Sequence, residues 1–366
     1  MKESILKNVY GEGCSLEVAG NMEIVKKFTN VEEEYEAIRS SVGIMDLSNY
    51  GIIKLKGDDV KELLQNITTR DFEYLPPEKV RTALLLDDDA NVISLIHVFN
   101  IETYYYVLTD PQHAEVTLEW FEQHAEGDVE VESRQGKDAV IAIEGPKSWE
   151  IAKEYLPFEI SAFAFMNASE IEIEDKKVIM SRFGFTGEYG YTFIAPAEIG
   201  ESLWNGIMKS GEDKDIKPCG NDALLACMIE VRQPDINTEL VEGSSLFESK
   251  LQWLIDFTKE DYIGYEAVKE KMEEEVPNGV IGFTCDLDKL PEDGAEVLIE
   301  DEVIGKVLCC YESKKLGGCI GLIFIKSEFV AVGLELNCKK NSGELIDIAT
   351  ISNPYIIPES WLVKMI

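Results

Sequence analysis

Apolar and polar residues alternate along this chain in two periods, one typical of short strands and the other of amphipathic helices. Residues 51–57 alternate with a period of two and predict a strand, whereas 59–67 have helical spacing after a capping residue, Asp58. Two apolar runs, 82–86 and 92–99, flank an aspartate-rich turn and predict a hairpin. Mixed helices and strands of this kind predict an α+β body.

The pattern changes towards the C-terminal part of the chain. Helical signals end after Met272, and from Gly279 short apolar runs are separated by glycine turns. This arrangement is typical of a small all-β domain. We therefore predict a body over residues 1–275 and a separate β domain over residues 276–366.

One stretch combines strands, glycines and a single carboxylate. Residues 181–193 read Ser-Arg-Phe-Gly-Phe-Thr-Gly-Glu-Tyr-Gly-Tyr-Thr-Phe, with Glu188 inside a turn punctuated by three glycines. Glycines let the backbone bend sharply and approach a ligand closely. A glutamate on such a turn can accept two parallel N–H bonds from a flat heterocycle. A solvated hairpin tip would have the same pattern, and the segment alone does not separate the two.

The composition of the chain limits the classes of molecule that it can bind. The chain has 34 basic and 70 acidic residues in 366, a formal charge of −36, which repels nucleic acids and anionic membranes. No apolar run reaches the roughly 18 residues of a membrane span, and the first residues do not resemble a signal peptide. The eight cysteines form no C-x-x-C pair, which predicts reduced, buried thiols, no metal site and a cytoplasmic location.

Several motifs resemble those of the glycine-cleavage T-protein (aminomethyltransferase) family. The glycine turn is similar to its S-R-T-G-Y-T-G-E-D-G-F-E signature. Other matches follow in the same order as in the family, at 43–51 (G-L-F-D-V-S-H-M-G), 81–87 (R-Y-T-L-L-L-N), 144–146 (Q-G-P), 217–220 (K-P-C-G) and 262–267 (F-I-G-K-E-A). Together they extend over more than 200 residues.

The resemblance implies a three-domain cloverleaf, with two interleaved ferredoxin-like α+β domains and a C-terminal β-barrel around a central opening. Tetrahydrofolate would lie in that opening with its pterin on Glu188. The positions that we assign to folate binding on this basis are Glu188, Tyr50, Thr109, Arg182 and Phe185. The implied partners are a small-molecule methyl or aminomethyl donor and a lipoyl carrier protein.

The chain departs from the family at the reacting end of the folate. The family's G-G-x-x-D-D-L-I-V carries an aspartate near the folate nitrogens, and residues 90–98 have Ser94 and Leu95 in place of the two aspartates. A hydroxyl cannot act as a carboxylate base at neutral pH. We assign Ser94 to positioning at the reacting atoms and His97 to proton transfer. Core packing explains His97 equally well.

Three functions remain open from the sequence. The first choice is a demethylase that moves a methyl group from an O-, S- or N-methylated small molecule to tetrahydrofolate, because the family aspartate is missing. The second is aminomethyl transfer from a lipoyl carrier, as in glycine cleavage. The third is a non-catalytic folate-binding protein like the YgfZ-type iron–sulfur assembly factors, although their motif cysteine is absent from residues 262–267.

Overall fold

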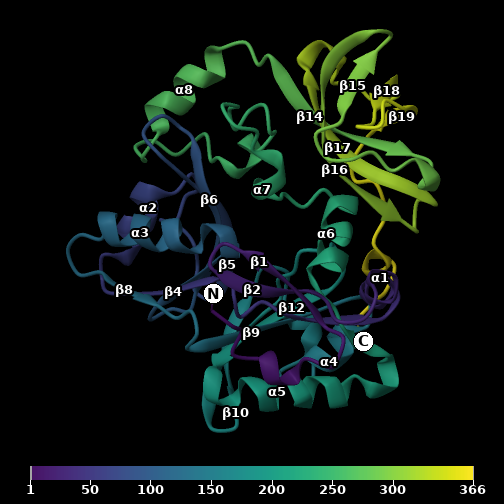
Figure 1. Ribbon diagram of the computed structural model, residues 1–366. Helices are drawn as coiled ribbons and strands as arrows, with labels where there is room; N and C mark the ends of the chain where they lie inside the picture. Colours follow the sequence, from purple (N-terminus) through teal and green to yellow (C-terminus); the bar gives the residue numbers. More distant parts are fainter. Residues whose placement is uncertain (1, 366) are drawn as a thin grey trace.

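The computed structural model describes residues 2–365 and has the α+β architecture expected from the sequence, with a closed β-barrel in its C-terminal part (Figure 1). The body contains a six-stranded and a five-stranded sheet, with a two-stranded ribbon of β1 (Ser15–Ala19) and β2 (Met22–Lys27) beside them. Within these residues no helix is long and apolar enough to cross a bilayer.

The six-stranded sheet forms the centre of the body. Its order is β10 (Ala168–Ile173), β11 (Lys176–Ser181), β12 (Gly190–Pro196), β9 (Asp138–Glu144), β3 (Val42–Asp46) and β13 (Ile216–Pro218). All neighbours are antiparallel except β13 and β3. Both faces are apolar and buried, so the strands are apolar almost throughout. Helices α4 (Ser148–Ala152) and α5 (Ala197–Ser210) cover one face.

The five-stranded sheet is inserted into the first one. After β3 the chain builds an antiparallel sheet and then returns with β9, which makes the two α+β units interleaved. The strand order is β5 (Lys79–Leu86), β6 (Val92–Asn100), β7 (Tyr105–Thr109), β4 (Gly51–Lys56) and β8 (Glu130–Ser133). Helices α2 (Val60–Ile67) and α3 (Ala114–His124) pack on it.

A shared apolar core joins the two sheets. It contains residues of both, such as Ile52 and Leu108 from one and Val140 and Ala142 from the other. Helices α1 (Val31–Ser40) and α6 (Asn221–Glu230) contribute to the same core. The capping residue predicted for the helix at 59–67 is displaced by one. Asp59 is the N-cap of α2, and its carboxylate accepts from the Asp128 N–H.

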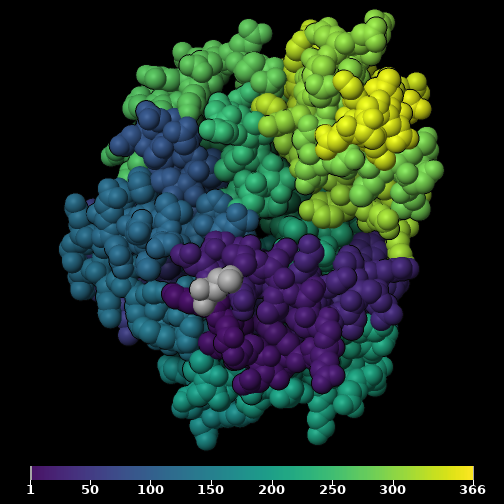
Figure 2. Space-filling view, in the orientation of Figure 1, coloured from purple at the N-terminus to yellow at the C-terminus, as the bar shows by residue number. Residues whose placement is uncertain are grey.

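The barrel begins at Asn278 and closes through six antiparallel strands. Their order is β14 (Asn278–Cys285), β17 (Gly318–Lys326), β16 (Glu302–Ser313), β15 (Glu296–Ile299), β18 (Glu335–Lys339) and β19 (Leu345–Ile351). Short helices α7 (Ile236–Glu239) and α8 (Tyr265–Glu273) precede it. After β19 the chain leaves the barrel and runs back to the body, where Ser360 contacts Glu188. In the space-filling view the green and yellow barrel stands beside the body, whose front is covered by the purple N-terminal segment (Figure 2).

Candidate functional site

The glycine turn between β11 and β12 is folded around a carboxylate from the neighbouring strand, Glu144. The N–H groups of Phe185 and Thr186 donate to this fully buried side chain at 2.9 Å each, and the Thr186 hydroxyl donates at 2.5 Å. Burial raises the pKa of Glu144. A Cβ on Gly184 would lie 2.8 Å from the Glu144 carboxyl, so a glycine is required there. The turn is thus a rigid element and not a loose hairpin tip.

Glu188 projects from this turn and is held by donors that come from two distant parts of the chain. Its carboxylate accepts from the Ser360 N–H (2.9 Å) and hydroxyl (2.6 Å), and from the Glu359 N–H (3.2 Å). The guanidinium of Arg39 lies 3.2 Å from Oε1, the oxygen that also accepts from the Glu359 N–H, and both charged side chains are fully buried. Glu188 is therefore saturated by the chain itself, and a ligand would have to replace the 359–360 segment to reach it.

A cleft of about 1010 Å³ opens between this turn, the segment 231–253, strand β14 and residues 351–361. Its charged lining consists of Arg182, Arg232 and Lys250 against the single carboxylate of Glu188, in a chain of net charge −36. Three exposed aromatic side chains complete its walls, namely Phe165, Trp253 and Trp361. The cleft therefore suits an anionic ligand that contains flat rings.

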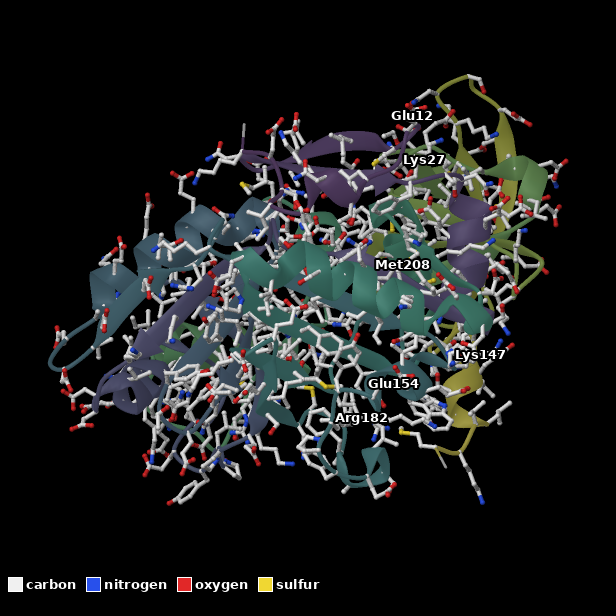
Figure 3. All side chains as sticks on the ribbon, turned by 90° about the horizontal axis from the view of Figure 1, so that it is seen from below. Glu12, Lys27, Lys147, Glu154, Arg182 and Met208 are labelled. Carbon is white, nitrogen blue, oxygen red and sulfur yellow. The ribbon has the colours of Figure 1, made fainter. Side chains whose placement is uncertain are left out.

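The three cations that line the cleft differ in the contacts that they make with other groups of the chain. Arg182 donates to the Phe163 carbonyl at 2.8 Å and lies over the ring of Tyr189. It is labelled in Figure 3, on the side of the body where the yellow C-terminal segment runs. Arg232 is only partly exposed and is paired in bidentate fashion with Glu239. Burial lowers the pKa of Lys250.

A second, much smaller cavity of about 50 Å³ adjoins the cleft, and Gln233 and Pro234 line both. Such a volume admits a few water molecules or a small group, but not a pterin ring. Its remaining walls come from β6, from the residues just before β4 and just after β7, from the glycine turn, from α6 and from the start of α7. The side chains are those of Tyr50, Leu95, His97, Asp110, Phe185, Met228, Asp235, Ile236 and Asn237.

Two residues assigned from the sequence, Ser94 and Thr109, do not line this cavity. Both are buried, and their hydroxyls are hydrogen-bonded to each other at 2.7 Å. Successive side chains of a strand point to opposite faces, so Leu95 rather than Ser94 lines the cavity. Asp110, which follows the last residue of β7, lines it as well. The structure thus places a leucine and an aspartate where the sequence analysis placed a serine and a threonine.

His97 lines the small cavity, but its surroundings are those of a core residue. Its Nδ1 lies 2.9 Å from the Thr82 hydroxyl, and its ring packs against Phe183 and Phe185. Burial lowers the pKa of His97 to about 3. At neutral pH the ring is uncharged, so it is not an imidazolium acid in this state.

The small cavity brings together two carboxylates that the sequence analysis did not assign, Asp110 and Asp235. Burial and the charge of Asp110 raise the pKa of Asp235, whose carboxylate accepts from the Thr238 hydroxyl (2.6 Å) and the Asn237 N–H. Burial, Asp110 and Asp235 together raise the pKa of Tyr50. Asp110 directly follows Thr109, a residue that was assigned from the sequence. No motif marks Asp235, because this residue comes close to Asp110 only in the folded chain.

A family model described as the GCVT N-terminal domain matches residues 6–259. The chain belongs to this family. It is 27% identical over 362 residues to the aminomethyltransferase of Bacillus subtilis (strain 168), covering 97% of this chain and 99% of the relative. Another relative is the aminomethyltransferase of Caldanaerobacter subterraneus subsp. tengcongensis, 30% identical over 313 residues and covering 85% and 84% of the two chains.

The fold is also similar to that of a solved structure, the glycine cleavage system aminomethyltransferase T from Bartonella henselae. The TM-score is 0.89 over 98% of both chains at 17% identity. The family resemblance and the fold inferred from the sequence are therefore confirmed. The relatives are named aminomethyltransferases, which favours the second of the three functions over the demethylase that was the first choice.

Proposed function

We propose that this chain transfers a one-carbon unit to tetrahydrofolate, and that the unit is an aminomethyl group delivered by a lipoyl carrier protein. The observation that carries the proposal is the full-length similarity to proteins named aminomethyltransferase, which extends over 97% of the chain. The demethylase hypothesis rested on the missing aspartate at residues 94–95, which counted against aminomethyl transfer. Asp110 and Asp235 supply carboxylates to the small cavity that Leu95 lines, so a missing carboxylate no longer counts against aminomethyl transfer.

Tetrahydrofolate fits the larger cleft better than any other space near the glycine turn. A volume of about 1010 Å³ is at the upper end for small-molecule sites. Trp253 and Phe165 offer faces for its rings, and Arg182 and Lys250 offer charge for its carboxylates. We place the pterin beside the glycine turn, with Glu188 as its acceptor once the 359–360 segment yields. Tyr50 and Phe185 would then border its reacting edge from the small cavity.

Asp235 is the group best suited to proton transfer in this arrangement. The N5 and N10 nitrogens of folate each form a bond to the carbon, while the bonds from that carbon to the lipoyl sulfur and to the amine nitrogen break. The two protons that leave N5 and N10 end on the lipoyl thiol and on the amine, which departs as ammonia and needs its proton delivered. Burial, together with the charge of Asp110, raises the pKa of Asp235, which favours this carboxyl as a proton donor.

One observation favours methyl transfer as the second candidate. Leu95 presents an apolar side chain to the small cavity where the family has an aspartate. An apolar wall suits a methyl group, and a displacement by the folate nitrogen depends mainly on alignment of donor and acceptor. This candidate has no need of Asp235 as a proton donor to ammonia.

The two candidates give different products in one experiment. The protein is incubated with tetrahydrofolate and either an aminomethylated lipoyl carrier or methylated small molecules. We expect 5,10-methylene-tetrahydrofolate and ammonia from the carrier. Asp235→Asn should lower kcat by about 10²- to 10⁴-fold, whereas Asp88→Asn, on the exposed hairpin tip, should leave it unchanged.

Production of 5-methyltetrahydrofolate without ammonia would replace the first proposal by the second. Folate binding without either product would favour a non-catalytic folate-binding protein. Absence of folate binding would overturn all three.

A further inference from the structure

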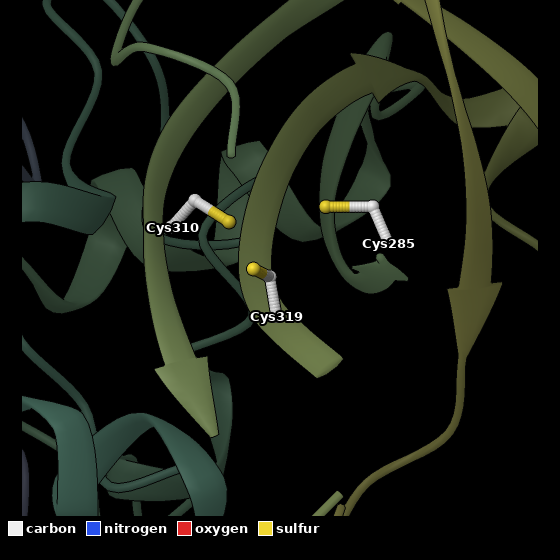
Figure 4. Close-up of side chains that lie close together, drawn as sticks. All are labelled: Cys285, Cys310 and Cys319. Carbon is white, nitrogen blue, oxygen red and sulfur yellow. The ribbon is translucent and has the colours of Figure 1, made fainter. Parts of the chain in front are cut away.

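Three cysteines far apart in sequence meet at one end of the barrel. Cys285 ends β14, Cys310 lies in β16 and Cys319 lies near the start of β17. Their sulfur atoms all lie within 4.8 Å of one another. Figure 4 shows the three side chains directed into one common space between the strands.

The strand register explains why the thiols converge. β17 lies between β14 and β16, and Cys319 is directly opposite Cys285 across the first pair of strands. On the other side, Cys310 is opposite Gly321, two residues along from Cys319 and hence on the same face. That face is the barrel interior, where Cys285 and Cys319 are buried among apolar side chains. The arrangement is fixed by three paired strands rather than by a flexible loop.

Two backbone carbonyls lie beside the sulfurs, of which those of Cys285 and Cys319 are buried and that of Cys310 is partly buried. The carbonyl oxygens of Asp286 and Lys289 lie 3.6 Å from the Cys319 and Cys285 sulfurs and can accept their S–H groups. Cys338 belongs to the same apolar core. Buried cysteines are common as packing residues, but such cysteines are usually far from one another in the core. Here three sulfur atoms lie within 4.8 Å of one another.

We propose that Cys285, Cys310 and Cys319 form a three-thiolate site for a single thiophilic metal ion, with Zn²⁺ as the representative of this class. Zinc–sulfur bonds of about 2.3 Å place the sulfurs of a tetrahedral site about 3.8 Å apart. Small side-chain rotations therefore close the observed triangle around an ion. Binding releases the three thiol protons to solvent, and the fourth position is taken by water. This proposal differs from the expectation of no metal site, which rested on the absence of C-x-x-C pairs; ligands brought together by strand pairing need no such spacing.

The site is independent of the proposed activity, since it lies inside the barrel and away from the cleft. A metal there would link β14, β16 and β17 and stabilise the barrel in the way that structural zinc sites stabilise small domains.

The test is a competition titration of the reduced, full-length protein with Zn²⁺ against a chromophoric chelator, with Cd²⁺ used in parallel for its thiolate charge-transfer absorption. We expect one equivalent of metal per chain. Cys310→Ala should weaken binding at least about tenfold. Cys309→Ala is the matched control, because Cys309 is its neighbour in β16 but packs outside the barrel interior, and its affinity should be unchanged.

A second measurement needs no variant and guards against misfolding of Cys310→Ala. Alkylation of the wild-type thiols, read by mass spectrometry, should slow at Cys285, Cys310 and Cys319 when Zn²⁺ is present, and not at the partly exposed Cys14. Equal binding by the wild type and Cys310→Ala would overturn the proposal. So would protection spread over all cysteines, or a disulfide within the cluster in protein purified under non-oxidising conditions.

Discussion

The strongest prediction concerns Arg39, the only cation in contact with Glu188 among residues 2–365. Its guanidinium is fully buried and also meets Glu230 at 2.8 Å and the carbonyls of Thr186 and Cys227 at 2.7 and 2.8 Å. Arg39→Met leaves two buried carboxylates without their positive partner. Removal of one member of a buried ion pair costs about 3–5 kcal/mol, because the remaining charge is uncompensated.

At about 2.1 cal/mol/K of unfolding entropy per residue, each kcal/mol shifts the Tm of a 366-residue unit by roughly 1.3 °C, so Arg39→Met should lower Tm by roughly 4–7 °C. The measurement is calorimetry or far-UV circular dichroism on heating. Lys339→Met is the control, since its pair with Glu296 is exposed on both sides and should change Tm little. Arg39→Met/Glu230→Gln should be less destabilised than the sum of the single variants, because one stranded charge is gone. A Tm drop below about 2 °C for Arg39→Met would refute the argument.

Three further outcomes are expected. Ser360→Ala removes a competing donor of about 1 kcal/mol from Glu188, and should tighten folate binding by up to about fivefold in calorimetric titration; weaker binding would contradict the proposed pterin acceptor. Burial lowers the pKa of Lys259 to about 7, so between pH 7 and about 10 the unfolded chain keeps a proton that the folded chain has lost, and stability from this residue rises with pH. The Tm of the wild type minus that of Lys259→Met should therefore increase from pH 6 to pH 9. A difference that stays constant would exclude the lowered pKa of Lys259. The His97 ring should stay neutral by NMR from pH 8 down to about 5, whereas a midpoint near 6.5 would show that it is accessible to solvent.

Local patterns predicted the elements of the fold well. The helix expected at 59–67 is α2 (Val60–Ile67), and the hairpin at 82–99 is β5 and β6. Asp88 and Asp89 at the tip of this hairpin are exposed. These features depend on neighbours a few residues away, which is the range that periodicity and turn residues report.

The site was predicted less well, and for a definite physical reason. Ser94 and Thr109 were assigned from their place in the family motifs, which does not say which of two successive residues faces a cavity. In the structure Leu95 and Asp110 line the small cavity, whereas the hydroxyls of Ser94 and Thr109 bond each other. Other parts of the candidate sites depend on contacts between segments that are far apart in sequence. Neither the carboxylate of Asp235 beside β7 nor the meeting of three cysteines in the barrel leaves a local signal.

The hydrogen bonds between Ser360 and Glu188 join residues 172 positions apart, with the whole barrel between them in sequence. At 5–20 residues per second, the ribosome adds residue 360 roughly 10 to 35 s after residue 188. During that interval Glu188 lacks these donors, while the rest of the glycine turn already has its own. The nascent chain therefore carries Glu188 without these donors until synthesis has passed the barrel. Ribosome-bound chains that stop before residue 359 should show faster hydrogen exchange at this turn than the released protein.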